Sequence, residues 1–141
     1  MVGRVYVPVG CWEYGRGRVY GYPQVRLKLI NLLGEELELE LPVDTGFEGS
    51  LLLDRETYEF FAVGELPREA WRTHRTLAGP LPMRAARAVA VIGGEKREVL
   101  VETPVYGLGK RLVGRELLNS LTLVLDGPRG LSCLAEPTGG S

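Results

Sequence analysis

The chain has 141 residues, of which 45% are hydrophobic, and its 17 Lys and Arg against 18 Asp and Glu leave a formal net charge of −1 at pH 7. These values are typical of one ordinary globular domain spanning residues 1–141. A near-zero charge without a block of like charges provides no field that attracts phosphate backbones or anionic lipid, so we expect neither nucleic acid nor a membrane as a partner.

The N-terminal segment, residues 1–21, is rich in Tyr and Gly and contains one predicted strand at 4–9. Arg4 lies where the apolar core of a signal peptide would have to be, so we expect no export and a cytoplasmic location. No apolar run reaches the roughly 18 residues of a membrane-spanning helix. The longest candidates, such as residues 85–94, are interrupted by charged residues and glycines.

Two cysteines, Cys11 and Cys133, are too few for the framework of a disulfide-dependent domain. We therefore expect both to be reduced, and either buried or without a role. Together with His74, the single histidine, they offer no pair of metal ligands at short spacing. The sequence predicts no metal site and no cofactor, and we expect His74 to lie on or near a hairpin strand without a catalytic role.

Residues 25–41 predict a β-hairpin. Three Leu alternate with three Glu over residues 36–41, which places the Leu side chains in the core and the carboxylates in water. Residues 25–29 alternate in the same way, and a Gly-containing turn joins the two runs. We expect Arg26 and Lys28 to face glutamates across the ladder.

The remainder of the chain also alternates at the period of a strand, with few helical segments. Further strands are predicted at 51–53, 73–77, 83–92, 99–102, 121–125 and 131–135, with turns at 78–80, 93–94 and 126–128. Short helices are predicted at 54–61, 67–71 and 115–119, and residues 136–141 predict a disordered tail. The fold class is therefore all-β.

An acidic residue directly follows the hairpin, in the segment LPVDTG at residues 41–46. A carboxylate at the end of an apolar strand, before a Gly that permits an unusual turn, is held close to the core while it faces outward. The same tripeptide also suits a tight turn that uses Asp, Thr and Gly for their turn chemistry alone. Asp44 is thus a candidate for chemistry and for a purely structural turn.

Residues 43–53 (VDTGFEGSLLL), taken together with residues 112–118 (LVGRELL), resemble two ordered motifs of the retropepsin-like aspartic proteases, above all their small prokaryotic and archaeal members. The resemblance implies a retropepsin-like core at residues 22–135, with the fold of a small closed β-barrel-like half-lobe and one short C-terminal helix. Residues 1–21 and residues 128–134 have no matching motif in it.

The resemblance also implies roles for individual residues, with Asp44 as the catalytic group. Six positions take supporting roles: hydrogen bonding across a dimer (Thr45), an amide close to the carboxylate (Gly46), packing (Leu112 and Val113), close chain approach (Gly114) and a tie between the short helix and nearby backbone (Arg115). The flap that closes over substrate falls on Ala78, Gly79 and Pro80.

Hydrolysis of a peptide by an activated water needs one carboxylate that takes a proton and a second, still protonated, that gives one. The sequence has a single Asp-Thr-Gly, and neither Asp54 nor Asp126 repeats it. A two-fold axis pairs a residue with its own copy, so a second chain must supply the other Asp44. Two carboxylates in contact share a proton, and the aspartic-protease dyad is the general example of this coupling. We therefore expect a homodimeric aspartic endopeptidase that cleaves peptides or proteins.

An alternative remains open at the level of sequence. Phe47 stands where many relatives have a small residue, and Glu116 stands where the retroviral enzymes have Asp or Asn. Because a fold does not determine a function, the chain also fits a protease-like β domain that binds peptides or a protein partner without cleaving them.

Overall fold

Strands make up most of the chain, as the alternating pattern predicts. The computed structural model describes residues 5–138. The strands are β1 (Val5–Glu13), β2 (Gly15–Arg16), β3 (Gly21–Tyr22), β4 (Gln24–Ile30), β5 (Glu36–Pro42), β6 (Leu51–Leu52), β7 (Thr73–Thr76), β8 (Gly79–Ile92), β9 (Glu95–Pro104), β10 (Leu112–Val113), β11 (Leu123–Asp126) and β12 (Leu131–Thr138). The helices are α1 (Arg55–Glu59) and α2 (Arg115–Leu118), with short 3₁₀ turns η1 (Ala62–Gly64) and η2 (Arg68–Ala70).

The β4–β5 hairpin confirms the predicted register. Leu39 and Leu41 are buried, Leu37 is half-buried, and the three Glu that alternate with them face solvent. Arg26 lies opposite Glu40 and forms an ion pair with it at 2.6 Å. Lys28 instead reaches diagonally to Glu36, at 3.5 Å, because a long side chain can contact the neighbour two positions along the same face.

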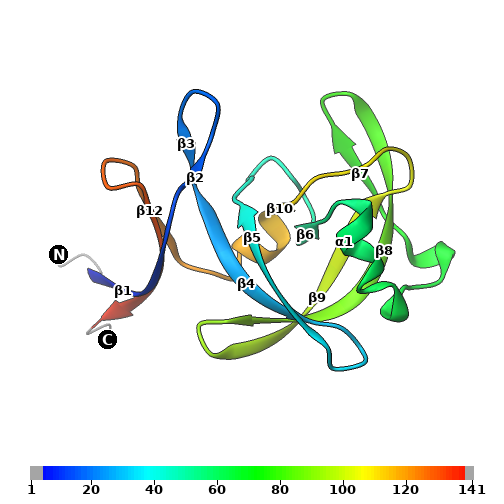
Figure 1. Ribbon diagram of the computed structural model, residues 1–141, viewed down its shortest axis with the longest axis horizontal. Helices are drawn as coiled ribbons and strands as arrows, with labels where there is room; N and C mark the ends of the chain where they lie inside the picture. Colours follow the sequence, from blue (N-terminus) through cyan, green and yellow to red (C-terminus); the bar gives the residue numbers. More distant parts are fainter. Residues whose placement is uncertain (1–4, 139–141) are drawn as a thin grey trace.

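The largest sheet has seven strands in the order β10-β6-β9-β8-β4-β5, with β7 paired to β8. The sheet is strongly curved, so that β5 and β10 lie side by side in Figure 1. Its two ends meet only through a single parallel bridge between Val43 and Val113. The expected barrel-like curvature is therefore present, but the strands do not close into a continuous barrel.

The main core fills the inside of this curved sheet. Leu27, Leu29 and Leu41 are completely buried there, together with Tyr58 of α1 and Phe61. The strand alternation explains the contribution of the sheet, since every second side chain of β4 and β5 points inward. A smaller second cluster consists of Phe47, Leu52, Met83 and Leu112.

The predicted helices form, but they are short. Asp54 caps α1 by accepting a hydrogen bond from Thr57 N at 3.1 Å. The segment predicted at 67–71 is the 3₁₀ turn η2, and the segment predicted at 115–119 contains α2. Among residues 5–138, no helix is long and apolar enough to cross a membrane.

A separate three-stranded sheet joins the two ends of the described chain, in the order β1-β12-β11. It lies at the left of Figure 1, beside the seven-stranded sheet. Cys11 lies directly opposite Cys133 in the β1–β12 register, and the two form a disulfide bond. The expectation of reduced cysteines was wrong, because two strands 122 positions apart in sequence pair with their cysteines in register.

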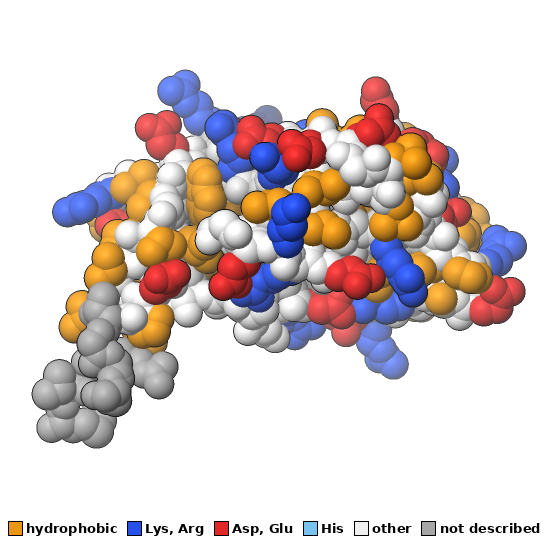
Figure 2. All heavy atoms as spheres, turned by 90° about the horizontal axis from the view of Figure 1, so that it is seen from below, with side chains coloured by type: hydrophobic (Ala, Val, Ile, Leu, Met, Phe, Trp, Pro, Cys, Tyr) orange, Lys and Arg blue, Asp and Glu red, His pale blue; other side chains and the backbone are white. Residues whose placement is uncertain are grey.

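Strand β12 continues farther than the sequence suggests. Residues 136–138, which the sequence assigned to a disordered tail, extend the ladder with β1, where Val7 pairs with Glu136 and Tyr6 with Pro137. Residues 139–141 of that predicted tail lie outside the described residues. Lys and Arg side chains are interspersed with Asp and Glu on the face shown in Figure 2, in keeping with the near-zero net charge.

Candidate active site

Asp44 lies where three strands of the curved sheet converge. Its backbone nitrogen donates to Val113 O at 2.9 Å, and the preceding residue, Val43, donates to Pro23 O at 2.9 Å. Strand β10 therefore lies between the chain leaving β5 and strand β6, with Leu112 opposite Leu52. These are backbone contacts inside an apolar framework, and they hold the main chain of Asp44 in place.

The carboxylate of Asp44 is bound by the turn that follows it. Its Oδ1 accepts a hydrogen bond from Gly46 N at 2.8 Å, which is the contact that the resemblance implies for Gly46. Phe47 N closes the turn by donating to Asp44 O at 3.2 Å. Asp44 is half-buried, whereas Thr45 and Gly46 are exposed. The carboxylate is thus oriented by its own turn and accessible from solvent.

Helix α2 packs directly against the loop that follows Asp44. Gly114 N donates to Ser50 O at 2.8 Å, Arg115 N to Phe47 O at 2.8 Å and Glu116 N to Gly49 O at 3.2 Å. The loop carbonyls thereby satisfy amides at the start of the helix that have no partner within it. A Cβ at Gly114 would overlap Phe47 and the backbone of Gly49, so only Gly permits this approach.

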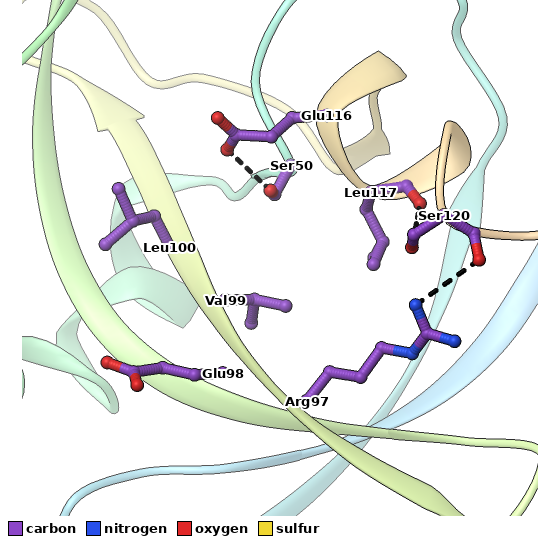
Figure 3. Close-up of a pocket in the computed structure, with 8 residues that line it drawn as sticks. All are labelled: Ser50, Arg97, Glu98, Val99, Leu100, Glu116, Leu117 and Ser120. Atoms are coloured by element: carbon purple, nitrogen blue, oxygen red, sulfur yellow. Dashed lines mark hydrogen bonds between the residues drawn. The ribbon is translucent and has the colours of Figure 1, made fainter.

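The side chain that ties α2 to the loop belongs to Glu116. Its Oε1 accepts from Ser50 Oγ at 2.7 Å, as Figure 3 shows, and its carboxylate also accepts two hydrogen bonds from Arg72. The bonds from Arg72 lower the pKa of the Glu116 carboxyl below its usual range. Arg115, to which the resemblance assigned this tie, is exposed and contacts the loop through its backbone nitrogen.

Sequence reasoning missed a buried charged cluster beneath this loop. Glu102 of β9 is completely buried, and His74 of β7 is 6% exposed. The Nε2 atom of His74 lies 3.0 Å from both carboxylate oxygens of Glu102, and Arg72 Nη2 donates to Glu102 Oε1 at 2.7 Å. The available signal was a Glu inside the apolar run of β9, where a charge is tolerated only if it is paired.

The predicted flap residues form the tip of the β7–β8 hairpin, where Thr76 pairs with Gly79. Gly79 has a φ of 108°, a value that favours glycine. Thr76 Oγ1 donates to Gly79 O at 2.8 Å and accepts from Ala78 N at 3.2 Å. In Figure 1 this hairpin projects on the same side of the molecule as the β2–β3 hairpin, with the loop after β5 between them.

A surface pocket of about 510 Å³ lies between β9 and α2 (Figure 3). It is lined by Ser50, Arg97, Glu98, Val99, Leu100, Glu116, Leu117 and Ser120, and Asp44 is not among them. Within residues 5–138 there is no cluster of three or more His, Cys, Asp or Glu side chains that could hold a metal ion.

Comparisons with known proteins give a likeness of structure. No protein-family model matches the sequence, and no curated protein matches it either. The structure of EIAV protease complexed with the inhibitor HBY-793 aligns with a TM-score of 0.48 at 13% identity, covering 74% of this chain and 92% of that one. A retropepsin-like aspartic protease from Rickettsia conorii aligns with a TM-score of 0.54 at 19% identity, covering 96% of this chain and 100% of that one. With its Asp44 turn set between β5, β6 and β10, the chain has the retropepsin-like aspartic protease fold.

Proposed function

We propose that the chain is an aspartic endopeptidase, and that it hydrolyses peptide or protein substrates as a homodimer in which each copy contributes the carboxylate of Asp44. The observation that carries the proposal is the placement of Asp44 in a retropepsin-like fold. Its backbone is bound to Val113 at the junction of three strands, while its side chain accepts one hydrogen bond, from Gly46, and remains accessible.

The other two aspartates have structural partners. Asp54 caps α1 and accepts from Arg111 Nε at 3.0 Å, and Asp126 accepts from Arg129 N at 3.2 Å in a turn. Within residues 5–138, Asp44 forms no ion pair with a Lys, Arg or His side chain. Of the three aspartates, Asp44 is thus the one that no cationic side chain in this range holds.

In the proposed dimer, a two-fold axis passes between the two Asp44 side chains. The ionised carboxylate takes a proton from a water molecule while the water oxygen bonds to the carbonyl carbon of the substrate peptide. The protonated carboxyl gives its proton to the carbonyl oxygen. The tetrahedral intermediate then collapses: a proton passes to the amide nitrogen, the C–N bond breaks, and a carboxyl and an amine product leave.

The supporting residues take the following parts in this proposal. Thr45 hydrogen-bonds across the axis beneath the two carboxylates, and Leu112, Val113 and Gly114 hold the loop against α2. The flap residues 78–80 close over the bound substrate. No metal and no cofactor enters the reaction, since two carboxylates and a water supply every proton that moves.

The test is the Asp44→Asn variant, which keeps the size of the side chain and removes its ionisable oxygen. Cleavage of a denatured protein and of a mixed-peptide library is measured from acid to neutral pH. We expect hydrolysis to fall by orders of magnitude in Asp44→Asn and to persist in the matched control Asp54→Asn, in which Asn still suits the helix cap. Sedimentation of the wild-type chain should give a dimer.

Two results would reject the proposal. One is activity that survives Asp44→Asn or that disappears equally in Asp54→Asn. The other is a wild-type chain that cleaves no substrate at any pH tested, and binding without cleavage would then support a peptide-binding domain.

A cytoplasmic location belongs to the same proposal. Disulfides are rare in the cytosol of most organisms and frequent in intracellular proteins of hyperthermophiles. Intracellular proteins of hyperthermophiles are the general setting in which a structural bond such as Cys11–Cys133 and a cytoplasmic location occur together. Fractionation of the source cells tests the location. Labelling of free thiols in the cytoplasmic fraction tests the bond, because both cysteines should resist the label until they are reduced.

A further inference from the structure

The buried carboxylate of Glu102 binds two side chains from the base of the β7–β8 hairpin. Arg72, which precedes β7, donates from Nη2 at 2.7 Å, and His74 of β7 places Nε2 at 3.0 Å from each oxygen. Glu102 is completely buried, so these partners replace the water that a carboxylate would otherwise need.

The same carboxylate lies against the loop that carries Asp44. A Cβ built on Gly49 would approach Glu102 Oε1 to 2.5 Å, so the Gly49 backbone and the carboxylate are in close contact. Arg72 continues the connection, because its guanidinium also binds Glu116, and Glu116 binds Ser50 Oγ at 2.7 Å. Loop, helix and hairpin base therefore meet at one charged cluster.

Two further contacts join the hairpin to the loop beside that cluster. The ring of Phe47 packs edge-on against His74, with the ring centroids 5.2 Å apart, and it shares the second apolar cluster with Met83 of β8. Arg75 N donates to Glu48 Oε1 at 2.9 Å. Phe47 and Glu48 are the third and fourth residues after Asp44, so the hairpin contacts the loop close to the candidate site.

We propose that Glu102 is a positioning residue: its buried carboxylate holds the base of the β7–β8 hairpin to the loop of Asp44, so that hairpin base and loop behave as one unit. Only the tip, around Leu77, is then left free to move. The mechanical coupling stands on the contacts described above, and its consequence for turnover rests on the proposed function. Asp44 and the base of the hairpin keep a constant relative position through Glu102, and the tip is the part that closes over the substrate.

Hydrogen exchange of single backbone amides tests the coupling without any need for activity. Arg75 N reports on the hairpin, and Asp44 N and Phe47 N report on the loop. In Glu102→Gln, which keeps the shape and removes the charge, we expect exchange at both sets of amides to speed up together by about tenfold or more, since both open as one unit. His74→Leu, which removes one partner of the carboxylate, should give a smaller change of the same pattern.

The matched control is Glu65→Gln. Glu65 accepts from Tyr58 Oη at 2.7 Å and from Arg84 Nε at 2.8 Å, in a second charged cluster that, among residues 5–138, has no hydrogen bond to the Asp44 loop. The Glu65→Gln variant should leave hydrogen exchange at the Arg75 and Phe47 amides unchanged. The proposal is overturned if Glu102→Gln speeds up exchange in the hairpin alone or in neither segment. It is also overturned if Glu65→Gln speeds up exchange equally. If Glu102→Gln does not fold, the same outcomes are read from His74→Leu.

Kinetics separate this inference from the proposed function. In an active enzyme, Glu102→Gln should lower kcat by about tenfold or more and raise KM at a temperature where the chain is folded, and Glu65→Gln should change neither. Unchanged kcat and KM in Glu102→Gln would contradict its positioning role. A wild-type chain that cleaves nothing rejects the proposed function, whereas the exchange experiment still decides the coupling.

Discussion

The two sheets of this protein are held together by different interactions. In the seven-stranded sheet, Leu27, Leu29 and Leu41 are completely buried, so apolar packing stabilises it. In the three-stranded sheet, Val5, Val7 and Val9 of β1 are 62%, 43% and 50% exposed, and a disulfide and a backbone ladder hold the strands. The region with the candidate site therefore depends on its core. The terminal sheet adds Trp12 and Leu134 to the edge of that core and depends more on its covalent bond.

The largest effect should come from the core beside the site. Leu41→Ala removes a completely buried side chain three positions before Asp44 and should lower the free energy of unfolding by about 2–5 kcal/mol. The matched substitution in the other sheet, Val7→Ala, should change it by less than about 0.5 kcal/mol. Urea unfolding measures both, and similar losses would contradict the comparison.

The disulfide should come next. Replacing Cys11 and Cys133 together by Ser should cost about 2–4 kcal/mol, and the loss should be concentrated in β1 and β12. Amides of the β1–β12 ladder should exchange faster, while those of the β4–β5 hairpin keep their protection. Equal loss of protection in both sheets would mean that the two regions unfold as one.

The smallest effect should be that of acid on stability, and it should fall on the region of the candidate site. Among the described residues, the carboxyls whose pKa lies below its usual value are Glu40, Glu48, Asp54 and Glu116, and none of them lies in the terminal sheet. A carboxyl whose pKa is lower in the folded state than in the unfolded state contributes to stability. That contribution is complete above the unfolded-state pKa, 4.5 for Glu116, and is lost as the pH falls through the folded-state pKa.

Glu116→Gln isolates one of these carboxyls. Solvent screens the partly exposed ion pair between Glu116 and Arg72. We therefore expect this pair to account for less than about 1 kcal/mol of the stability that the wild-type chain loses between neutral pH and pH 3. The variant should therefore lose less stability than the wild-type chain over that interval. A steeper loss in the variant would show that the sign of the shift is wrong.

The sequence predicted the features that depend on local pattern. The β4–β5 hairpin follows from strict alternation, and the start of α1 follows from a capping Asp54. Strand β10 could not be predicted, since Leu112 and Val113 form a strand only through pairing with β6.

Two features of the site and its surroundings depend on distant partners. Glu102 receives its partners from the segment around β7, and its link to Ser50 passes through a residue of α2. The Cys11–Cys133 bond depends on the register of two strands far apart in sequence. The residue types alone do not determine the register in which distant strands pair, nor which separate segments come together.

The disulfide has one more consequence for a chain proposed to cut proteins. Because it joins residues 122 positions apart, it closes the backbone between them into a covalent ring. A single nick within that ring, for example at the exposed Leu77, releases no fragment and adds only the mass of one water. A molecule cut once within the ring therefore stays in one piece on a non-reducing gel, and its two pieces separate only after the disulfide is reduced.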